Sequence, residues 1–152
     1  MRFLISPFVG AGKIKFGMTP DQVRLLLGEV FDSFKRTEES VFPCDYFENL
    51  GVFAYYNASG VLEAIEFTEP AVPEFEEMDL LKIRFKDLIT YLSDKDKDLE
   101  VESDSLTSHV LGIGAYAPDA DDNTSLPAES IIVFENGYYD LFESVDISIS
   151  IC

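Results

Sequence analysis

The amino-acid sequence predicts an α+β fold made of two tandem units, each a helix followed by antiparallel sheet. The first observation behind this prediction is an internal similarity, because residues 50–55 read LGVFAY and residues 111–116 read LGIGAY. The second is that apolar residues recur at helical spacing before each copy, and a strand-like segment ending in Phe67 or Phe134 follows each copy. Such a pattern is typical of a diverged duplication, and chance similarity between two generic amphipathic units is the alternative.

The first unit opens with a short strand predicted over residues 2–5, and a helix signal comes later. Thr19 is the expected N-cap, Pro20 suits the first helical position, and Gln22 completes a capping box. Gly28 is expected to end the helix, because glycine readily adopts the left-handed conformation found there. The apolar face of this helix is formed by Val23, Leu26 and Leu27.

Three strands are predicted to complete the first unit, over residues 44–50, 52–57 and 61–68. The turn sequence at residues 58–60 separates the last two strands, which should therefore form an antiparallel hairpin. Residues 70–79 contain two prolines and several acids, so an exposed linker is expected there.

The second unit is predicted to begin with another amphipathic helix, in which Leu88 stands 65 residues after Val23. Strands are expected over residues 106–117 and 130–135, with a long acidic loop between them. Residues 145–151 alternate between apolar and polar side chains and are expected to form an edge strand. The predicted division is residues 1–69 for the first unit, 70–79 for the linker and 80–152 for the second unit, with a single compact domain as the alternative.

The charge of the chain restricts its partners. The 152 residues include 29 acidic and 11 basic side chains, which gives a net charge of −18 and a pI of about 4.1. Binding to nucleic acid or to an anionic membrane surface is not expected, because both need clustered Lys and Arg side chains. A basic protein partner would be attracted, although the same charge also serves solubility alone.

The cysteine count and the hydropathy pattern predict a cytoplasmic protein. Cys44 and Cys152 are the only cysteines, which is too few for a disulfide framework. The apolar residues near the start are interrupted by Ser6 and Pro7, so they do not form a signal segment. No apolar run approaches the length of a membrane span.

Two acidic segments resemble the start of a calcium loop, one at residues 94–98 and one at residues 119–123. Both lack the glycine at the sixth position and the bidentate Glu at the twelfth. We therefore expect no metal and no cofactor. A small-ligand or calcium-binding domain that uses these acidic loops is the alternative function.

No residue pattern indicates an enzyme. A thiol dyad of Cys44 and His109 would need spatial proximity, and no basic neighbour in sequence would lower the pKa of the thiol. Gly10 and Gly12 precede Lys13, but the spacing of a phosphate-binding loop is missing, so a turn is expected. The chain is therefore predicted to have no catalytic residues.

Aromatic and acidic side chains lie close together in the predicted hairpin strands. Tyrosine provides a large contact area at low entropic cost, and carboxylates beside it would select a Lys-rich or Arg-rich partner. An ordinary sheet with its acids on the wet face is the alternative. The residues predicted to bind the partner are Asp45, Tyr46, Tyr55, Tyr56, Glu63 and Glu66 on the sheet, with Asp119, Asp121 and Asp122 in the long loop.

Residues 14–23 read IKFGMTPDQV and are followed by Leu27 and Gly28. This segment resembles a pattern in small bacterial proteins, where an apolar strand end and Gly-Met-Thr or Gly-Met-Ser lead into a capped helix that closes on Leu-Gly. The helix-then-hairpin order, taken twice, resembles the tandem fold of the β-lactamase inhibitor protein family. A single unit is similar to the small lipoprotein of the outer-membrane barrel assembly machine.

The chain is also similar to bacterial immunity proteins that neutralise polymorphic toxins, which are often small, acidic and free of catalytic motifs. These resemblances imply an immunity or inhibitor protein that acts by protein–protein contact and occludes a basic toxin. The chain has neither the lipobox of the lipoprotein nor the disulfides of the secreted inhibitor. The envelope role of the lipoprotein is therefore not expected here.

Overall fold

The computed structural model describes residues 1–35, 38, 42–120 and 122–138, and its largest element is a sheet of eight antiparallel strands. The strands of this sheet are β4 (Asp32–Phe34), β5 (Cys44–Phe47), β6 (Val52–Tyr56), β7 (Leu62–Phe67), β10 (Glu100–Val101), β11 (Ser105–Ser108), β12 (Ile113–Tyr116) and β13 (Ser130–Phe134). Their spatial order is β10-β11-β12-β13-β7-β6-β5-β4.

A second sheet has five strands and also draws on distant parts of the chain. Its strands are β1 (Arg2–Ser6), β2 (Gly10–Ala11), β3 (Ile14–Lys15), β8 (Val72–Phe75) and β9 (Met78–Asp79), in the order β3-β2-β1-β8-β9. β1 and β8 run parallel, with Phe3 opposite Pro73. The remaining neighbours in this sheet are antiparallel.

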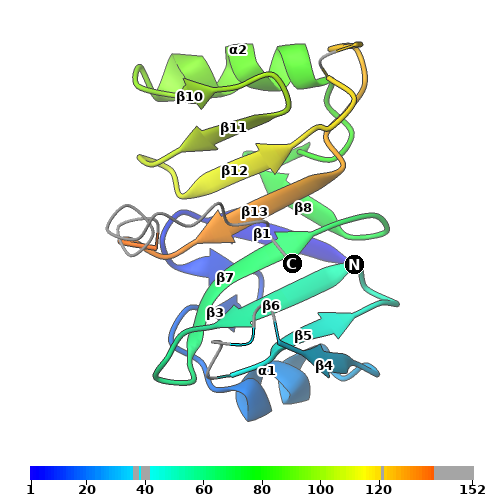
Figure 1. Cartoon of the computed structure of the whole chain (residues 1–152), viewed down its shortest axis with the longest axis vertical. Helices are drawn as coiled ribbons and strands as arrows, with labels where there is room; N and C mark the ends of the chain where they lie inside the picture. The colour runs from blue at the N-terminus through cyan, green and yellow to red at the C-terminus, as the bar shows by residue number, and fades with distance from the viewer. Residues whose placement is uncertain (36–37, 39–41, 121, 139–152) are drawn as a thin grey trace.

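Two helices lie at opposite ends of the eight-stranded sheet, as Figure 1 shows. α1 (Pro20–Leu27) has 8 residues and α2 (Phe85–Lys95) has 11. The predicted start of α1 is confirmed, because Thr19 and Gln22 form the capping box, and Gly28 ends the helix with a φ of 62°. The expected inward faces are confirmed in part, since Val23 and Leu27 of α1 and Leu88 and Leu92 of α2 are buried. Leu26, also expected on the apolar face of α1, is 41% exposed.

The prediction of an α+β fold with two tandem helix-then-sheet units is wrong, because the described chain is mostly β. β7 and β13 pair with each other, and Ile65 stands opposite Val133. The hydrogen bonds between them join both halves of the chain into one continuous sheet. The two short helices cover parts of this shared sheet and do not each pack on a sheet of their own.

Several predicted strands are confirmed, but residues 106–117 form two strands instead of one. β11 and β12 are joined by a turn in which the amide of Gly112 donates to the carbonyl of Ser108 (2.9 Å). The same turn joins β5 to β6, where the amide of Gly51 donates to the carbonyl of Phe47 (2.9 Å). The two similar LG segments are therefore two copies of one turn.

Residues 70–79, expected as an exposed linker, contain β8 and β9. Glu74 and Phe75 of β8 are buried, and the side chain of Arg2 forms an ion pair with Glu74 (2.7 Å). Residues 1–69 thus contribute strands to both sheets, residues 70–79 supply β8 and β9 of the five-stranded sheet, and the described strands after residue 80 all belong to the eight-stranded sheet. The alternating segment at residues 145–151 lies outside the described residues.

The main apolar core fills the space between the two sheets and the helices. The face of the eight-stranded sheet that borders this core is called the inner face here, and it carries Val52, Ile65, Ile113 and Ile131 among others. The opposite face is called the outer face. A smaller cluster packs there, formed by Cys44, Tyr55, Ala64, Ile132, Phe134 and Tyr138 with Phe53 beside them.

Candidate functional site

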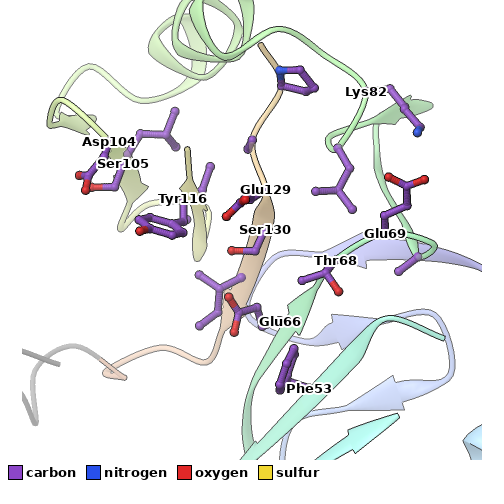
Figure 2. A pocket seen from close by; sticks show the side chains of 18 of the residues that line it. Phe53, Glu66, Thr68, Glu69, Lys82, Asp104, Ser105, Tyr116, Glu129 and Ser130 are labelled. Atoms are coloured by element: carbon purple, nitrogen blue, oxygen red, sulfur yellow. The ribbon is translucent and has the colours of Figure 1, made fainter. Parts of the chain in front are cut away.

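The outer face of the eight-stranded sheet carries a groove of about 1180 Å³. Figure 2 shows Ser130 of β13 near the middle of the groove, with Tyr116 on one side and Thr68 on the other. Residues 68–72 and 126–129, together with Asp119, form parts of its walls. A groove of this size is large enough to hold several side chains of a partner protein.

The register of the sheet places small residues along the floor of the groove. Gly114 stands opposite Ile132 on one side and opposite Thr107 on the other. A Cβ atom at Gly114 would lie 2.9 Å from Cγ2 of Ile132, which is too close for a normal contact. Glycine is therefore required here for the close packing of β12 against β13. Because it has no side chain, it leaves space in the groove above the backbone of β12.

One end of the groove is bordered by aromatic rings. Phe53 of β6 stacks on Tyr46 of β5, with ring centroids 4.1 Å apart and an interplanar angle of 14°. Phe34 contacts Phe53 edge-on at 6.4 Å. Phe53 is half-buried and lines the groove, so these stacked rings form a planar, apolar border.

The charge of the groove is strongly acidic. Among its described lining residues, Lys82 is the single base. The five acids are Glu66, Glu69, Asp104, Asp119 and Glu129. Carboxylates around a concave surface reinforce one another's field and attract cations into the concavity.

Glu66 is the acid that lies deepest in the groove, and its orientation is fixed. Its exposed fraction is 7%, and the hydroxyl of Tyr55 donates a hydrogen bond to its Oε1 atom. Tyr55 itself is completely buried. The carboxylate is thus held in place by a neighbour on β6 before any ligand arrives.

Two of the predicted binding residues, Asp45 and Tyr56, belong to a buried network on the inner face. Arg24 of α1 binds both carboxylate oxygens of Asp45, at 2.8 and 2.9 Å. The hydroxyls of Tyr56 (2.9 Å) and Ser33 (2.6 Å) also donate to Asp45. The bond to Asp45 raises the pKa of Arg24, so this network holds α1 against β5 and does not face a partner.

The other predicted binding residues are distributed between the groove and separate places. Glu66 and Asp119 line the groove, and the Tyr55 hydroxyl donates a hydrogen bond to Glu66.

The remaining predicted residues that the structure describes lie outside the groove lining. Tyr46 is half-buried and stacks on Phe53, while Glu63 is buried and its carbonyl accepts a hydrogen bond from the amide of Glu135 (2.9 Å). Asp122 is exposed outside the lining, and Asp121 lies outside the described residues.

Burial of Tyr56 leads to a testable pH dependence of stability. Desolvation is the main cause that raises the pKa of Tyr56 above its usual value of 10, and the Asp45 carboxylate adds to it. Unfolded Tyr56 ionises near pH 10 while folded Tyr56 keeps its proton, so its contribution is complete below pH 10 and is lost as the pH rises further.

The free energy of unfolding, measured by urea denaturation between pH 8 and 11, should therefore fall less steeply in Tyr56→Phe than in the unaltered chain. Tyr116→Phe is the control, because Tyr116 is 41% exposed. Tyr91→Phe would not serve, because burial also raises the pKa of Tyr91, to about 12. An unchanged pH slope in Tyr56→Phe would contradict the role given to Tyr56.

The residues considered for metal or thiol chemistry are placed separately. Asp96 is buried and accepts hydrogen bonds from the Ser108 hydroxyl (2.8 Å) and the Asp98 amide (2.9 Å). Cys44 is buried in the outer-face cluster, and Nε2 of His109 lies 3.3 Å from a carboxylate oxygen of Glu100. Within the described ranges, no three His, Cys, Asp or Glu side chains are grouped so that they could hold a metal ion.

Phe53, Gly114, Tyr116 and Ser130 are groove residues that the sequence analysis did not select. Only the pairing of β7 with β13 would have pointed to them together, because this pairing brings β6 and β12 into one sheet. That pairing joins residues far apart in the sequence, and no local pattern reports it.

Comparison of the chain with protein-family models, with curated proteins and with solved structures gave no match. The described part of the chain contains no helix with the length and apolar character needed to cross a membrane.

Proposed function

We propose that this chain is a non-catalytic binding module that holds a basic protein partner in the groove on the outer face of its sheet. The observation that carries the proposal is the composition of the groove lining, with five carboxylates against one ammonium group. The net charge of −18 also attracts a basic partner, and it does so over a longer range than the groove alone. Complementary charge favours a Lys-rich or Arg-rich surface and opposes an acidic one.

Binding would proceed in two physical steps. The field of the chain steers a basic partner toward the groove and raises the association rate about 10- to 1,000-fold at low salt. Aromatic contact with Phe53 and Tyr116 then adds buried apolar area once the partner has docked. The steering step depends on ionic strength, whereas the docking step depends on side-chain shape.

An immunity or inhibitor protein is the biological form of this function that we propose. In that form the partner is a basic toxin domain, and the bound chain covers the active site of the toxin. The acidity of the chain and its groove support this form. A neighbouring gene for a toxin with a basic terminal domain would supply the partner for a direct binding assay.

The groove can be tested before the partner is known, with the blocked peptide acetyl-Gly-Lys-Gly-Lys-Gly-amide as the probe. The test variant carries Asp104→Asn, Asp119→Asn and Glu129→Gln, which remove three charges from the groove lining. We expect its affinity for the lysine peptide to fall about tenfold, measured by calorimetric titration at low salt.

The control variant loses three charges from exposed acids outside the lining, through Asp94→Asn, Asp98→Asn and Glu102→Gln. It has the same net charge as the test variant, so it should bind the peptide within about twofold of the unaltered chain. Equal losses in the two variants would show that net charge alone attracts the peptide, and would refute the groove as the binding site.

A further inference from the structure

The chemistry of the groove points to one kind of partner side chain, and this inference rests on the proposed function. We propose that the groove takes an arginine of the basic partner, with the guanidinium stacked on Phe53 and facing Glu66. The site is defined by the two residues named and by the groove that both of them line.

The pairing of the strands determines how the ring of Phe53 is presented. Phe53 stands opposite Tyr46 on one neighbouring strand and opposite Glu66 on the other. One face of the ring is occupied by Tyr46, which stacks on it at 4.1 Å. Tyr55, two residues further along β6, lies nearly parallel to the ring with centroids 6.2 Å apart. The face of Phe53 opposite Tyr46 is directed across β7, on the side where Glu66 stands, and Figure 2 shows the two residues side by side at one end of the groove.

Glu66 supplies the negative charge beside this ring. Residues directly opposite in an antiparallel pair have Cβ atoms about 4.5–5.5 Å apart, so a group that stacks on Phe53 lies within reach of Glu66. The hydroxyl of Tyr55 fixes the carboxylate from the same face of the sheet. A fixed carboxylate next to a flat ring satisfies the two requirements of a guanidinium, which are an acceptor and a stacking surface.

The arrangement discriminates arginine from lysine. The guanidinium is planar, stacks on aromatic faces and is weakly hydrated, so it loses little when it enters a partly buried groove. The ammonium of lysine is a compact and strongly hydrated charge that cannot stack. Carboxylates at the rim attract both side chains, whereas Phe53 together with the buried Glu66 favours arginine.

The test compares two blocked peptides of equal charge on the full chain, the lysine peptide used above and acetyl-Gly-Arg-Gly-Arg-Gly-amide. We expect the arginine peptide to bind about three- to tenfold more tightly at low salt. In Phe53→Leu, which keeps an apolar side chain but removes the ring, the two affinities should become equal. Phe34→Leu is the matched control, because Phe34 packs edge-on against Phe53 and lies outside the groove lining.

A second variant tests the carboxylate. Glu66→Gln keeps an acceptor for the Tyr55 hydroxyl and removes the charge, so it should reduce the arginine preference while the melting temperature stays close to that of the unaltered chain. The comparison of the two peptides on the unaltered chain needs no variant, so it stands even if one of the substitutions prevents folding.

The possible outcomes separate this inference from the proposed function. Equal affinity for the two peptides, or an arginine preference that survives in Phe53→Leu, overturns the arginine site and leaves the acidic groove as a binding site. The two charge-neutralised variants described above, one in the groove lining and one outside it, test the proposed function. If both lose lysine-peptide binding to the same extent, the proposed function is refuted and the arginine site is refuted with it.

Discussion

Asp45→Ala is expected to destabilise the protein by about 3–5 kcal/mol, because it leaves a buried charge network without its anion. Asp45 is completely buried and receives Arg24 through two nitrogens, together with the hydroxyls of Tyr56 and Ser33. Removal of the carboxylate leaves the Tyr56 hydroxyl without this acceptor and the Arg24 guanidinium without its main counter-charge. Urea denaturation of the variant and the unaltered chain measures the difference in free energy of unfolding.

Asp21→Ala is the matched control for this effect. Asp21 also forms an ion pair with Arg24, at 3.8 Å, but its side chain is 96% exposed. Exposed ion pairs contribute about 0–1 kcal/mol, so this variant should lie near the unaltered chain. A loss below about 1 kcal/mol in Asp45→Ala would contradict the stabilising role given to this network. It would mean that the Arg24 side chain, which is 30% exposed, rotates into solvent when its counter-charge is removed.

The elements that could be predicted from the sequence are those with local signals. α1 has its capping box at Thr19 and Gln22, and β6 and β7 flank a turn with Gly60. The strands that were missed are mostly too short for a hydrophobic period to emerge, because β2, β3, β9 and β10 have two residues each. β8 was missed because Pro73 and the acids in and after this strand suggested a linker, although β1 pairs with it.

The fold class was wrong for a different reason. Two similar helix-and-strand segments are compatible with two separate sheets or with one shared sheet, and the choice depends on whether β7 pairs with β13. This contact joins Phe67 to Ile131, and burial of the shared core must offset the entropic cost of closing such a long loop. Local patterns in the sequence carry no information about it.

The candidate site was predicted only in part, and the alternation of side chains explains the difference. Tyr55 and Tyr56 are adjacent in β6, so their side chains point to opposite faces of the sheet. Tyr55 supports Glu66 at the groove, whereas Tyr56 binds Asp45 in the inner core. Acidic and aromatic residues that are close in sequence therefore lie in two different places, one in the groove proposed to bind a partner and one in the buried network on the inner face.

Gly51→Ala is the second substitution with a large expected effect, and it tests the turn that carries the repeated LG sequence. Gly51 has a φ of 69°, and a Cβ atom there would lie 2.2 Å from the carbonyl oxygen of Thr68. The amide of Thr68 donates to the Gly51 carbonyl at 2.8 Å, so the two segments cannot separate without losing this bond. We expect the strain and the clash together to cost at least about 3 kcal/mol of unfolding free energy.

Gly28→Ala separates the two causes, because it shares the backbone conformation without the clash. Gly28 has a φ of 62°, and the nearest atom to its added Cβ would be the Leu25 carbonyl oxygen at 4.0 Å. Left-handed conformation alone should cost about 1–2 kcal/mol in this variant. Similar losses at the two glycines would contradict the clash at Gly51, while a larger loss there shows that the tight approach to Thr68 holds the end of β7 in place. Because Thr68 lines the groove, Gly51→Ala should also weaken the lysine peptide, and Gly28→Ala should not.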